Sequence, residues 1–390
     1  MKVDIRELGQ FNHLASQGAR RAASSLSQLT GVQMDVEVTD VSLVTETVLA
    51  ETFTGRSFVG VEVGLEGGLD GETVLAFERE RALTLQKLLL EATGADDTLA
   101  QSSVTELGNI MIGGFIDGWA NHLNTAINMT PPKYTEAVGP RILPEQAIKA
   151  AQNHGVFLFE SRLEAMDVDL DFSIYMLPEY RQFVKLLSGT GKGNRIPVNR
   201  LSTFERLAKQ GAGNAAGQIE MMTGLSTDVE VSRLRFVPLT GVPKQVGNDR
   251  FIGVVFELKG LPSGYLVVLF DEASAMTVVG SMLPSSPEDG IGTMTQGAIK
   301  ELGNIMTSGF IDGWANVLGT SIEHTPPEFV HDLGESIMSP VVGRLGQRQD
   351  YAFVIDSTIE IDGQKGRCDI YALPDERELA RALSALPEQQ

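Results

Sequence analysis

The chain has 390 residues, of which 42% are hydrophobic and 21% charged. This composition is typical of a folded globular protein with two or three domains, and it excludes a disordered or collagen-like chain. The 51 acidic and 31 basic residues give a formal charge of -20, which argues against partners with a phosphate backbone or an anionic membrane surface. The acidity also hints at a salt-adapted cell, although chance composition explains it nearly as well.

The sequence carries no sign of export. Cys368 is the only cysteine, so an intrachain disulfide is impossible. The first ten residues lack the apolar core of a signal peptide, and no apolar run reaches the roughly 18 residues of a membrane span. The sequence therefore predicts a cytoplasmic protein.

Helical and strand patterns alternate along the first half of the chain. Apolar residues recur at helical spacing from Leu8 to Leu26, followed by β-rich runs at 36–49, 57–65 and 72–77 and a short helix at 79–92. The same order returns as a helix at 99–128, strands at 134–142, 155–162 and 168–176, and a helix from Pro178. The links between strands look too short for crossovers, which predicts an α+β fold. In it, two pseudo-symmetric α-βββ-α halves share a mostly antiparallel sheet.

This pattern occurs twice. Residues 106–121 read ELGNIMIGGFIDGWAN and residues 301–316 read ELGNIMTSGFIDGWAN, at an offset of 195 residues. Shorter echoes keep the register along the whole chain, such as DVEV at 35–38 and 228–231. A polar, glycine-rich stretch from Ser188 to Asn194 separates the copies. We therefore predict two tandem units, residues 1–190 and 191–390.

Three common kinds of site find no support in the motifs. Residues 211–216 fit G-x-G-x-x-A, but they follow a helical pattern where a dinucleotide site needs a strand, so helix packing is the better interpretation. The five histidines lack metal-ligand spacing, and no serine lies in a G-x-S-x-G motif. We therefore expect no metal and no other cofactor to be held by this chain.

The duplicated segment contains a polar pair at helical spacing. Glu106 and Asn109, like Glu301 and Asn304, lie three residues apart, which places both side chains about 60° apart on one helix face. Ser103 and Glu106 also fit a capping box. The second copy has alanine in place of that serine yet keeps its carboxylate and amide, so capping alone does not account for the pair.

Seven residues extend this pair to a longer pattern. They are Ser102, Glu106, Asn109 and Pro131 in the first copy, and Glu301, Asn304 and Pro326 in the second. The pattern resembles the signature of the CheC/CheX/FliY family of chemotaxis phosphatases: Asp or Ser, then Glu, then Asn, and a proline about 22 residues later. Gly297 stands at the Asp/Ser position of the second copy. The likeness covers essentially the whole chain as two tandem CheC-like units.

One departure concerns the first helix of each unit. CheC proteins often carry a second E-x-x-N there, but this chain has His13 and Ser16 in one copy and Arg206 and Lys209 in the other. We therefore expect one usable site per unit and two per chain.

The resemblance implies that the chain removes phosphate from the aspartyl residue of the response regulator CheY. It implies that Asn109 and Asn304 position the attacking water, while Glu106 and Glu301 pair with the active-site lysine of the receiver. Mg²⁺ would come with CheY. Phosphorylated CheY is the expected partner, and the receptor deamidase CheD is a second candidate.

An alternative is a non-catalytic CheC-like scaffold that binds CheD or a component of the flagellar motor. Tandem duplication and the two altered first helices are compatible with it. The Glu/Asn pair in both copies favours the enzyme, because a scaffold has no evident use for an amide that positions water. The sequence leaves open which receiver is the substrate, whether CheD binds, whether both sites are active, and the oligomeric state.

Overall fold

The computed structural model describes residues 2–93, 99–188, 195–197, 200–283, 291–362 and 366–386. Within these residues, no helix combines the length and apolar character that a bilayer crossing requires. The chain divides into an N-terminal unit, Val3–Gly193, and a C-terminal unit, Asn194–Gln390 with Met1–Lys2. Residues 189–194 of the expected glycine-rich linker lie outside the described residues, so the boundary at residue 190 stays a prediction.

The N-terminal unit consists of two halves of similar element order. After β1 (Lys2–Asp4), the first half contains α1 (Ile5–Thr30), β2 (Met34–Val44), α2 (Glu46–Phe53), β3 (Ser57–Gly67), β4 (Gly71–Glu78) and α3 (Arg79–Thr93). The second half contains α4 (Ala100–Leu123), β5 (Ile127–Met129), β6 (Lys133–Val138), the 3-10 turn η2 (Gly139–Ile142), α5 (Glu145–His154), β7 (Val156–Ala165), β8 (Asp171–Pro178) and α6 (Tyr180–Leu187).

The C-terminal unit repeats this order. After β9 (Arg195–Pro197), its first half contains α7 (Leu201–Thr223), β10 (Thr227–Pro238), the 3-10 turn η4 (Leu239–Gly241), α8 (Val242–Val246), β11 (Arg250–Gly260), β12 (Gly264–Asp271) and α9 (Glu272–Met282). The second half contains α10 (Thr293–Leu318), β13 (Ile322–His324), β14 (Glu328–Leu333), α11 (Gly334–Leu345), β15 (Tyr351–Ile361), β16 (Gly366–Pro374) and α12 (Glu376–Ala385).

The two halves of each unit contribute strands to one shared sheet, in which strands of one half pair with strands of the other. The N-terminal sheet has the order β2-β7-β8-β4-β3-β6, with β5 also on β3, and these pairs are antiparallel. The C-terminal sheet repeats it as β10-β15-β16-β12-β11-β14, with β13 also on β11. In the N-terminal unit, β2 of the first half thus pairs with β7 of the second, and β3 of the first half pairs with β6 of the second, which relates the two halves by an approximate two-fold axis. The predicted α+β class, with paired halves and an antiparallel sheet, is confirmed.

Several element boundaries differ from the predicted ones. Two short helices of the N-terminal unit were not predicted: α2, which follows β2, and α5, which follows β6 and η2. The β-rich run at 36–49 contains most of β2 and the start of α2, because periodicity alone does not separate a strand from a short helix in such a run. The helix predicted to reach residue 128 ends at Leu123, where Asn124 takes a left-handed φ of 49°, a conformation that asparagine tolerates at a helix end.

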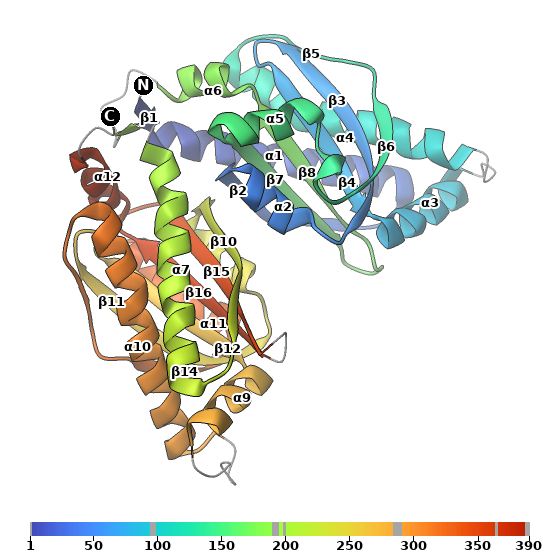
Figure 1. Cartoon of the computed structure of the whole chain (residues 1–390). Coiled ribbons are helices and arrows are strands. Elements are labelled where there is room, and N and C mark those ends of the chain that lie inside the picture. Colours follow the sequence, from blue (N-terminus) through green and yellow to red (C-terminus); the bar gives the residue numbers. More distant parts are fainter. Residues whose placement is uncertain are drawn as a thin grey trace. The chain divides into compact units, whose positions relative to one another are not determined.

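The helices of the N-terminal unit cover both faces of its sheet (Figure 1). The long helices α1 and α4 pack on each other, and Trp119 of α4 is buried between Phe11 of α1, at 5.3 Å between ring centroids, and Phe159 of β7, at 4.9 Å. Residues of α2 and α5, such as Phe53 and Ala147, form a second apolar cluster with the sheet. The sheet is therefore a middle layer, buried on both sides.

Glycines set the close packing of the long helices. A Cβ on Gly18 of α1 would lie 2.6 Å from the carbonyl oxygen of Phe115 in α4, and one on Gly211 of α7 would lie 3.0 Å from the ring of Phe310 in α10. Residues 211–216 lie inside α7. Their interpretation as helix packing is confirmed, because Gly211 is a point of contact between two helices.

Candidate functional site

The Glu/Asn pairs lie in the central helix of each unit. In α4, Glu106 is exposed and Asn109 is half-buried. In α10, Glu301 and Asn304 have the same exposures. Each unit therefore presents a carboxylate in solvent and, one turn later, an amide at the border of the packed surface.

The glycine before each asparagine brings the helix close to the sheet. A Cβ on Gly108 would lie 2.6 Å from Cβ of Val61 in β3, and Gly303 packs at least as closely on Val254 of β11. Real Cβ atoms do not approach so closely, so only glycine allows these helices to rest on these strands. The adjacent Asn109 and Asn304 are positioned by this contact.

Replacing Gly108 tests the contact. Gly108→Ala should destabilise the N-terminal unit by about 1–3 kcal/mol, because the added methyl group collides with Val61. The matched control is Gly113→Ala in the same helix, where the added Cβ would meet Cε of Met129 at 3.5 Å, an ordinary van der Waals distance. The control should be neutral or gain up to about 1 kcal/mol from helix propensity. Equal urea midpoints for the two variants would contradict this account.

The capping-box interpretation of Ser103 and Glu106 is wrong. The helix begins at Ala100, and its N-cap residue, Leu99, makes no side-chain capping bond. Ser103 therefore lies within the helix rather than before it. Ser102 also lies in the first turn and is exposed, whereas Gly297 lies inside α10, which begins four residues earlier at Thr293.

The signature prolines are placed by a short strand and a threonine. Pro131 follows β5, and the preceding Thr130 donates its N–H to the Gly64 carbonyl at 2.9 Å while its Oγ1 accepts from the Gly64 N–H at 2.8 Å. The C-terminal unit repeats both bonds between Thr325 and Glu257, at 3.0 and 3.1 Å, before Pro326. The 22-residue spacing thus spans the rest of the helix, a turn and a strand attached to the sheet edge.

The sequence analysis did not single out the last residue of that short strand as part of the candidate site. Met129 ends β5 beside Gly113, and His324 ends β13 with its Nε2 3.1 Å from Oγ of Ser308. The signal was their matched position, since each precedes the signature proline by two residues in the motifs M-T-P and H-T-P. The strand residue therefore differs between the two units where it meets the helix that carries the Glu/Asn pair.

The first helices carry different groups at the positions of the second family motif. In α1, His13 is exposed, with Nε2 2.9 Å from Nε2 of Gln17, and Ser16 is half-buried. In α7, Lys209 is exposed, and the side chain of Arg206 lies outside the described residues. A carboxylate and an amide are thus absent from these four positions.

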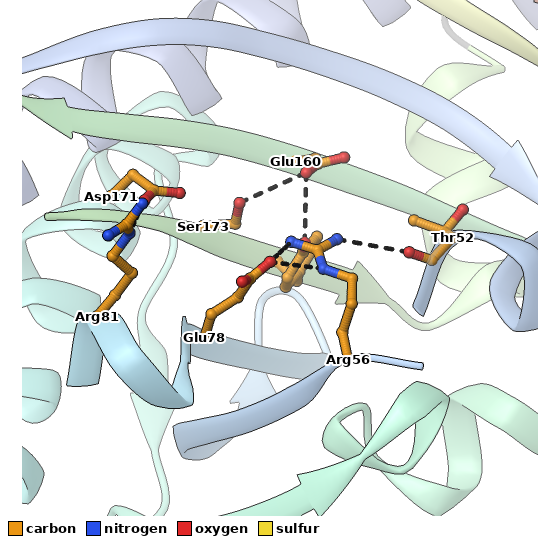
Figure 2. Close-up of polar contacts among 8 residues, drawn as sticks. Thr52, Arg56, Glu78, Arg81, Glu160, Asp171 and Ser173 are labelled. Atoms are coloured by element: carbon orange, nitrogen blue, oxygen red, sulfur yellow. Dashed lines mark hydrogen bonds and ion pairs between the residues drawn. The ribbon is translucent and has the colours of Figure 1, made fainter. Parts of the chain in front are cut away.

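A separate polar group lies on strands of the N-terminal sheet (Figure 2). Arg56 contacts Glu78 at 2.5 Å, and Glu160 accepts hydrogen bonds from Ser173 at 3.4 Å and Tyr175 at 3.3 Å. Burial first, and then the Glu160 carboxylate, raise the pKa of Tyr175. Arg56, which directly precedes β3, thus contacts the end of β4, and Glu160 joins β7 to β8, so these contacts link neighbouring segments of the sheet.

A cavity of about 840 Å³ in the N-terminal unit is lined by acidic side chains from β3 and β4 and by α5. Burial, and then the neighbouring Glu62 carboxylate, raise the pKa of Glu72 to about 7, against a smaller opposing effect of Lys133. Throughout the described part of the chain, no three His, Cys, Asp or Glu side chains gather as a metal site requires. Burial and the Glu62 carboxylate therefore destabilise the ionised form of Glu72 in the folded protein.

The destabilised Glu72 carboxylate predicts that the stability of the N-terminal unit depends on pH. The pKa of Glu72 in the folded chain lies above its ordinary value of 4.5, so folding takes up a proton and stability is lost as pH rises from about 4.5 to 7. Glu72→Gln should raise the free energy of unfolding by about 1–2 kcal/mol at pH 8, with solvent screening taken into account, and change little at pH 4. The exposed neighbour Glu66→Gln is the control, and an equal gain from both variants would refute the assignment.

Comparison with known proteins gives a family match over the segment of each unit that contains a Glu/Asn pair. A model of the CheC-like family matches residues 99–135 and 294–331. These ranges contain both Glu/Asn pairs and both signature prolines. The match therefore falls once in each unit, on α4 and α10 and the strands that follow them.

Relatives match about half of the chain each. "Putative CheY-P phosphatase CheC1" of Halobacterium salinarum is 36% identical over 182 residues, which cover 46% of this chain and 92% of the relative. The CheY-P phosphatase CheC of Bacillus subtilis is 23% identical over 201 residues, or 48% of this chain and 92% of the relative. The crystal structure of Thermotoga maritima FliY is similar over 47% of this chain and 94% of its own, at 20% identity and a TM-score of 0.38.

Proposed function

The chain belongs to the CheC-like family, and we propose that it is a chemotaxis protein that hydrolyses the aspartyl phosphate of CheY-P, with one site in each unit. The names of the two CheC relatives support the activity. The observation that carries the proposal is the Glu/Asn pair, repeated on the central helix of both units with the same exposures. A repeated pair of this kind suits two docking and reaction sites.

The proposed role of Asn109 and Asn304 is to hold the attacking water. In the hydrolysis, a water oxygen bonds to phosphorus in line with the bond to the aspartyl oxygen that breaks, which leaves a carboxylate and inorganic phosphate. An acyl phosphate is reactive, so positioning of the water and stabilisation of charge are the main tasks. An amide can bind water without taking up a proton. The half-buried position of each amide limits its motion.

The proposed role of Glu106 and Glu301 is to dock the receiver. Both carboxylates are exposed and can pair with a lysine at the receiver's active site through a charge-assisted hydrogen bond. Because each lies one turn from its asparagine, this contact would also fix the distance from phosphorus to the amide. We propose that Mg²⁺ is held by the receiver, and that this chain contributes the amide and the carboxylate.

The experiment that tests this function measures the decay of acyl-phosphorylated CheY with and without the full-length chain. Decay faster than the intrinsic rate, in proportion to the amount of chain added, is expected. An unchanged rate at saturating chain would refute phosphatase activity.

We expect the two units to differ in strength at pH 7.5. Ser102 supplies a hydroxyl at the first signature position, while Gly297 supplies none and adds backbone freedom in the helix interior, which costs about 1 kcal/mol. Full-length Asn304→Ala, in which only the N-terminal pair is intact, should therefore turn over faster than Asn109→Ala. The opposite order would contradict this prediction, and Gly297→Ser should reduce the difference.

A non-catalytic scaffold for CheD or a motor component is the second candidate function. The altered first helices are compatible with it, since His13 and Ser16 stand in the N-terminal unit where CheC proteins often carry a second Glu/Asn pair. A scaffold would bind its partner without accelerating phosphate loss. Binding of CheD or a motor component by both the native chain and the Asn109→Ala, Asn304→Ala variant, with no turnover by either, would favour the scaffold.

A further inference from the structure

A third polar side chain continues the Glu/Asn face of α10. Glu301, Asn304 and Ser308 lie at positions i, i+3 and i+7, which share one face of a helix. His324, at the end of β13, meets this face, with its Nε2 3.1 Å from Oγ of Ser308. The imidazole therefore joins the helix within one turn of the asparagine proposed to hold water.

The imidazole and the serine connect two backbone carbonyl oxygens through a series of three polar contacts. Nδ1 of His324 lies 2.9 Å from the carbonyl oxygen of Thr325, and Oγ of Ser308 lies 2.9 Å from the carbonyl oxygen of Asn304. The two ends of this series, the carbonyl oxygens of Thr325 and Asn304, can only accept hydrogen bonds. Three contacts between these ends therefore require three protons, on Nδ1, Nε2 and Oγ.

Only the protonated imidazole supplies all three. In the imidazolium, Nδ1–H donates to Thr325, Nε2–H donates to Ser308, and the Ser308 hydroxyl donates to Asn304. In the neutral ring with its proton on Nδ1, the single hydroxyl proton of Ser308 can reach Nε2 or the Asn304 carbonyl, but not both. Loss of the proton thus removes one link between β13 and the turn that carries Asn304.

The surroundings of the ring are compatible with a positive charge. The ring of Phe256 in β11 meets the imidazole edge-on, with centroids 5.0 Å apart, and Leu258 is the register partner of His324. The elements around the ring carry ten charged or titratable side chains besides His324, and all are exposed except Lys300 and His331, which are half-buried. They are Lys300, Glu301 and Asp312 on α10, Arg250, Glu257 and Lys259 on β11, Glu323 on β13, and Glu328, His331 and Asp332 on β14.

The N-terminal unit has a contact between strand and helix at the same place, but neither of the two residues that form it can be protonated. Gly113 and Met129 occupy the positions of Ser308 and His324 at the offset of 195 residues. A Cβ on Gly113 would lie 3.5 Å from Cε of Met129, so the strand residue again meets the helix here. A thioether beside a glycine has no group that titrates.

We propose that His324 is a positioning residue of the C-terminal site, and that its protonation, relayed by Ser308, makes this site alone more active as pH falls. The proposal rests on the proposed phosphatase function. Histidine changes charge between about pH 5 and 8. The complete chain of bonds restrains the turn that carries Asn304, and a restrained amide positions water more often, so the effect falls on kcat rather than KM.

The kinetic test compares the two sites within the full-length chain from pH 6 to 8. Asn109→Ala isolates the C-terminal site, and Asn304→Ala isolates the N-terminal site and corrects for the pH dependence of CheY itself. The ratio of C-terminal to N-terminal kcat should fall about threefold or more as pH rises. His324→Met or Ser308→Gly, which introduce the residue types of the N-terminal unit, should make the ratio constant. A constant ratio in the native background, or an unchanged fall in His324→Met, would overturn the proposal.

A second readout does not depend on turnover. In NMR titrations of the full-length chain, the side-chain amide signals of Asn304 should shift with the same midpoint as the His324 ring, and Ser308→Gly should abolish this coupling. Asn304 signals that ignore the His324 titration would overturn the proposal. If the coupling is present but no variant accelerates phosphate loss, the proposed phosphatase function fails while the proton relay stands.

Discussion

The double variant Asn109→Ala, Asn304→Ala should lose phosphatase activity, while each single variant retains the activity of the other unit. Each asparagine lies on its own helix, in its own unit and beside its own sheet. Changes at sites without shared partners add in free energy and act independently. The measurement is the rate of CheY-P decay at saturating substrate for the native chain, both single variants and the double variant.

The control variants are Asn121→Ala and Asn316→Ala. These asparagines are exposed on the same two helices, within the same duplicated segment. Their replacement should leave turnover within about twofold of the native rate, because it alters amide content and helix propensity without touching the pair. Loss of all activity in either Asn109→Ala or Asn304→Ala would refute two independent sites.

Replacement of Glu106 and replacement of Asn109 should have different kinetic effects, because we assign the two residues different tasks. A group that only docks the receiver stabilises the ground state and the transition state alike, so its loss raises KM with little change in kcat. A group that positions the attacking water acts on the barrier, and its loss should lower kcat by about 100-fold or more. In an Asn304→Ala background, Glu106→Gln should therefore weaken apparent affinity, and Asn109→Ala should remove turnover but leave binding.

Binding and turnover are measured separately to resolve these effects. Affinity for CheY carrying a stable phosphoryl analogue gives the docking term, and single-turnover decay at saturating enzyme gives the chemical step. Asp117→Asn, an exposed carboxylate eleven residues further along α4, is the matched control for Glu106→Gln. Full binding with full turnover in the Asn109→Ala, Asn304→Ala variant would mean that the amides are structural, and the scaffold would then be the better function.

The duplication and the polar pairs could be read from the chain alone. The segment that begins at Glu106 returns at Glu301 almost unchanged, and such a repeat needs no structure to identify. The three-residue spacing from Glu106 to Asn109 also translates directly into one helix face, because the geometry of a helix is local. The roles of both residues came only from the family resemblance, and they stay proposals.

The tertiary structure decided which strands pair and which side chains meet. The strands β2 and β3 are consecutive, yet β2 pairs with β7 and β3 pairs with β4 and β6, because the short helix α2 carries the chain away between them. The meeting of Ser308 with His324, 16 residues apart, likewise depends on β13 pairing along β11. Sequence periodicity reports which face of an element is buried, but a contact between two elements depends on how the whole sheet is assembled.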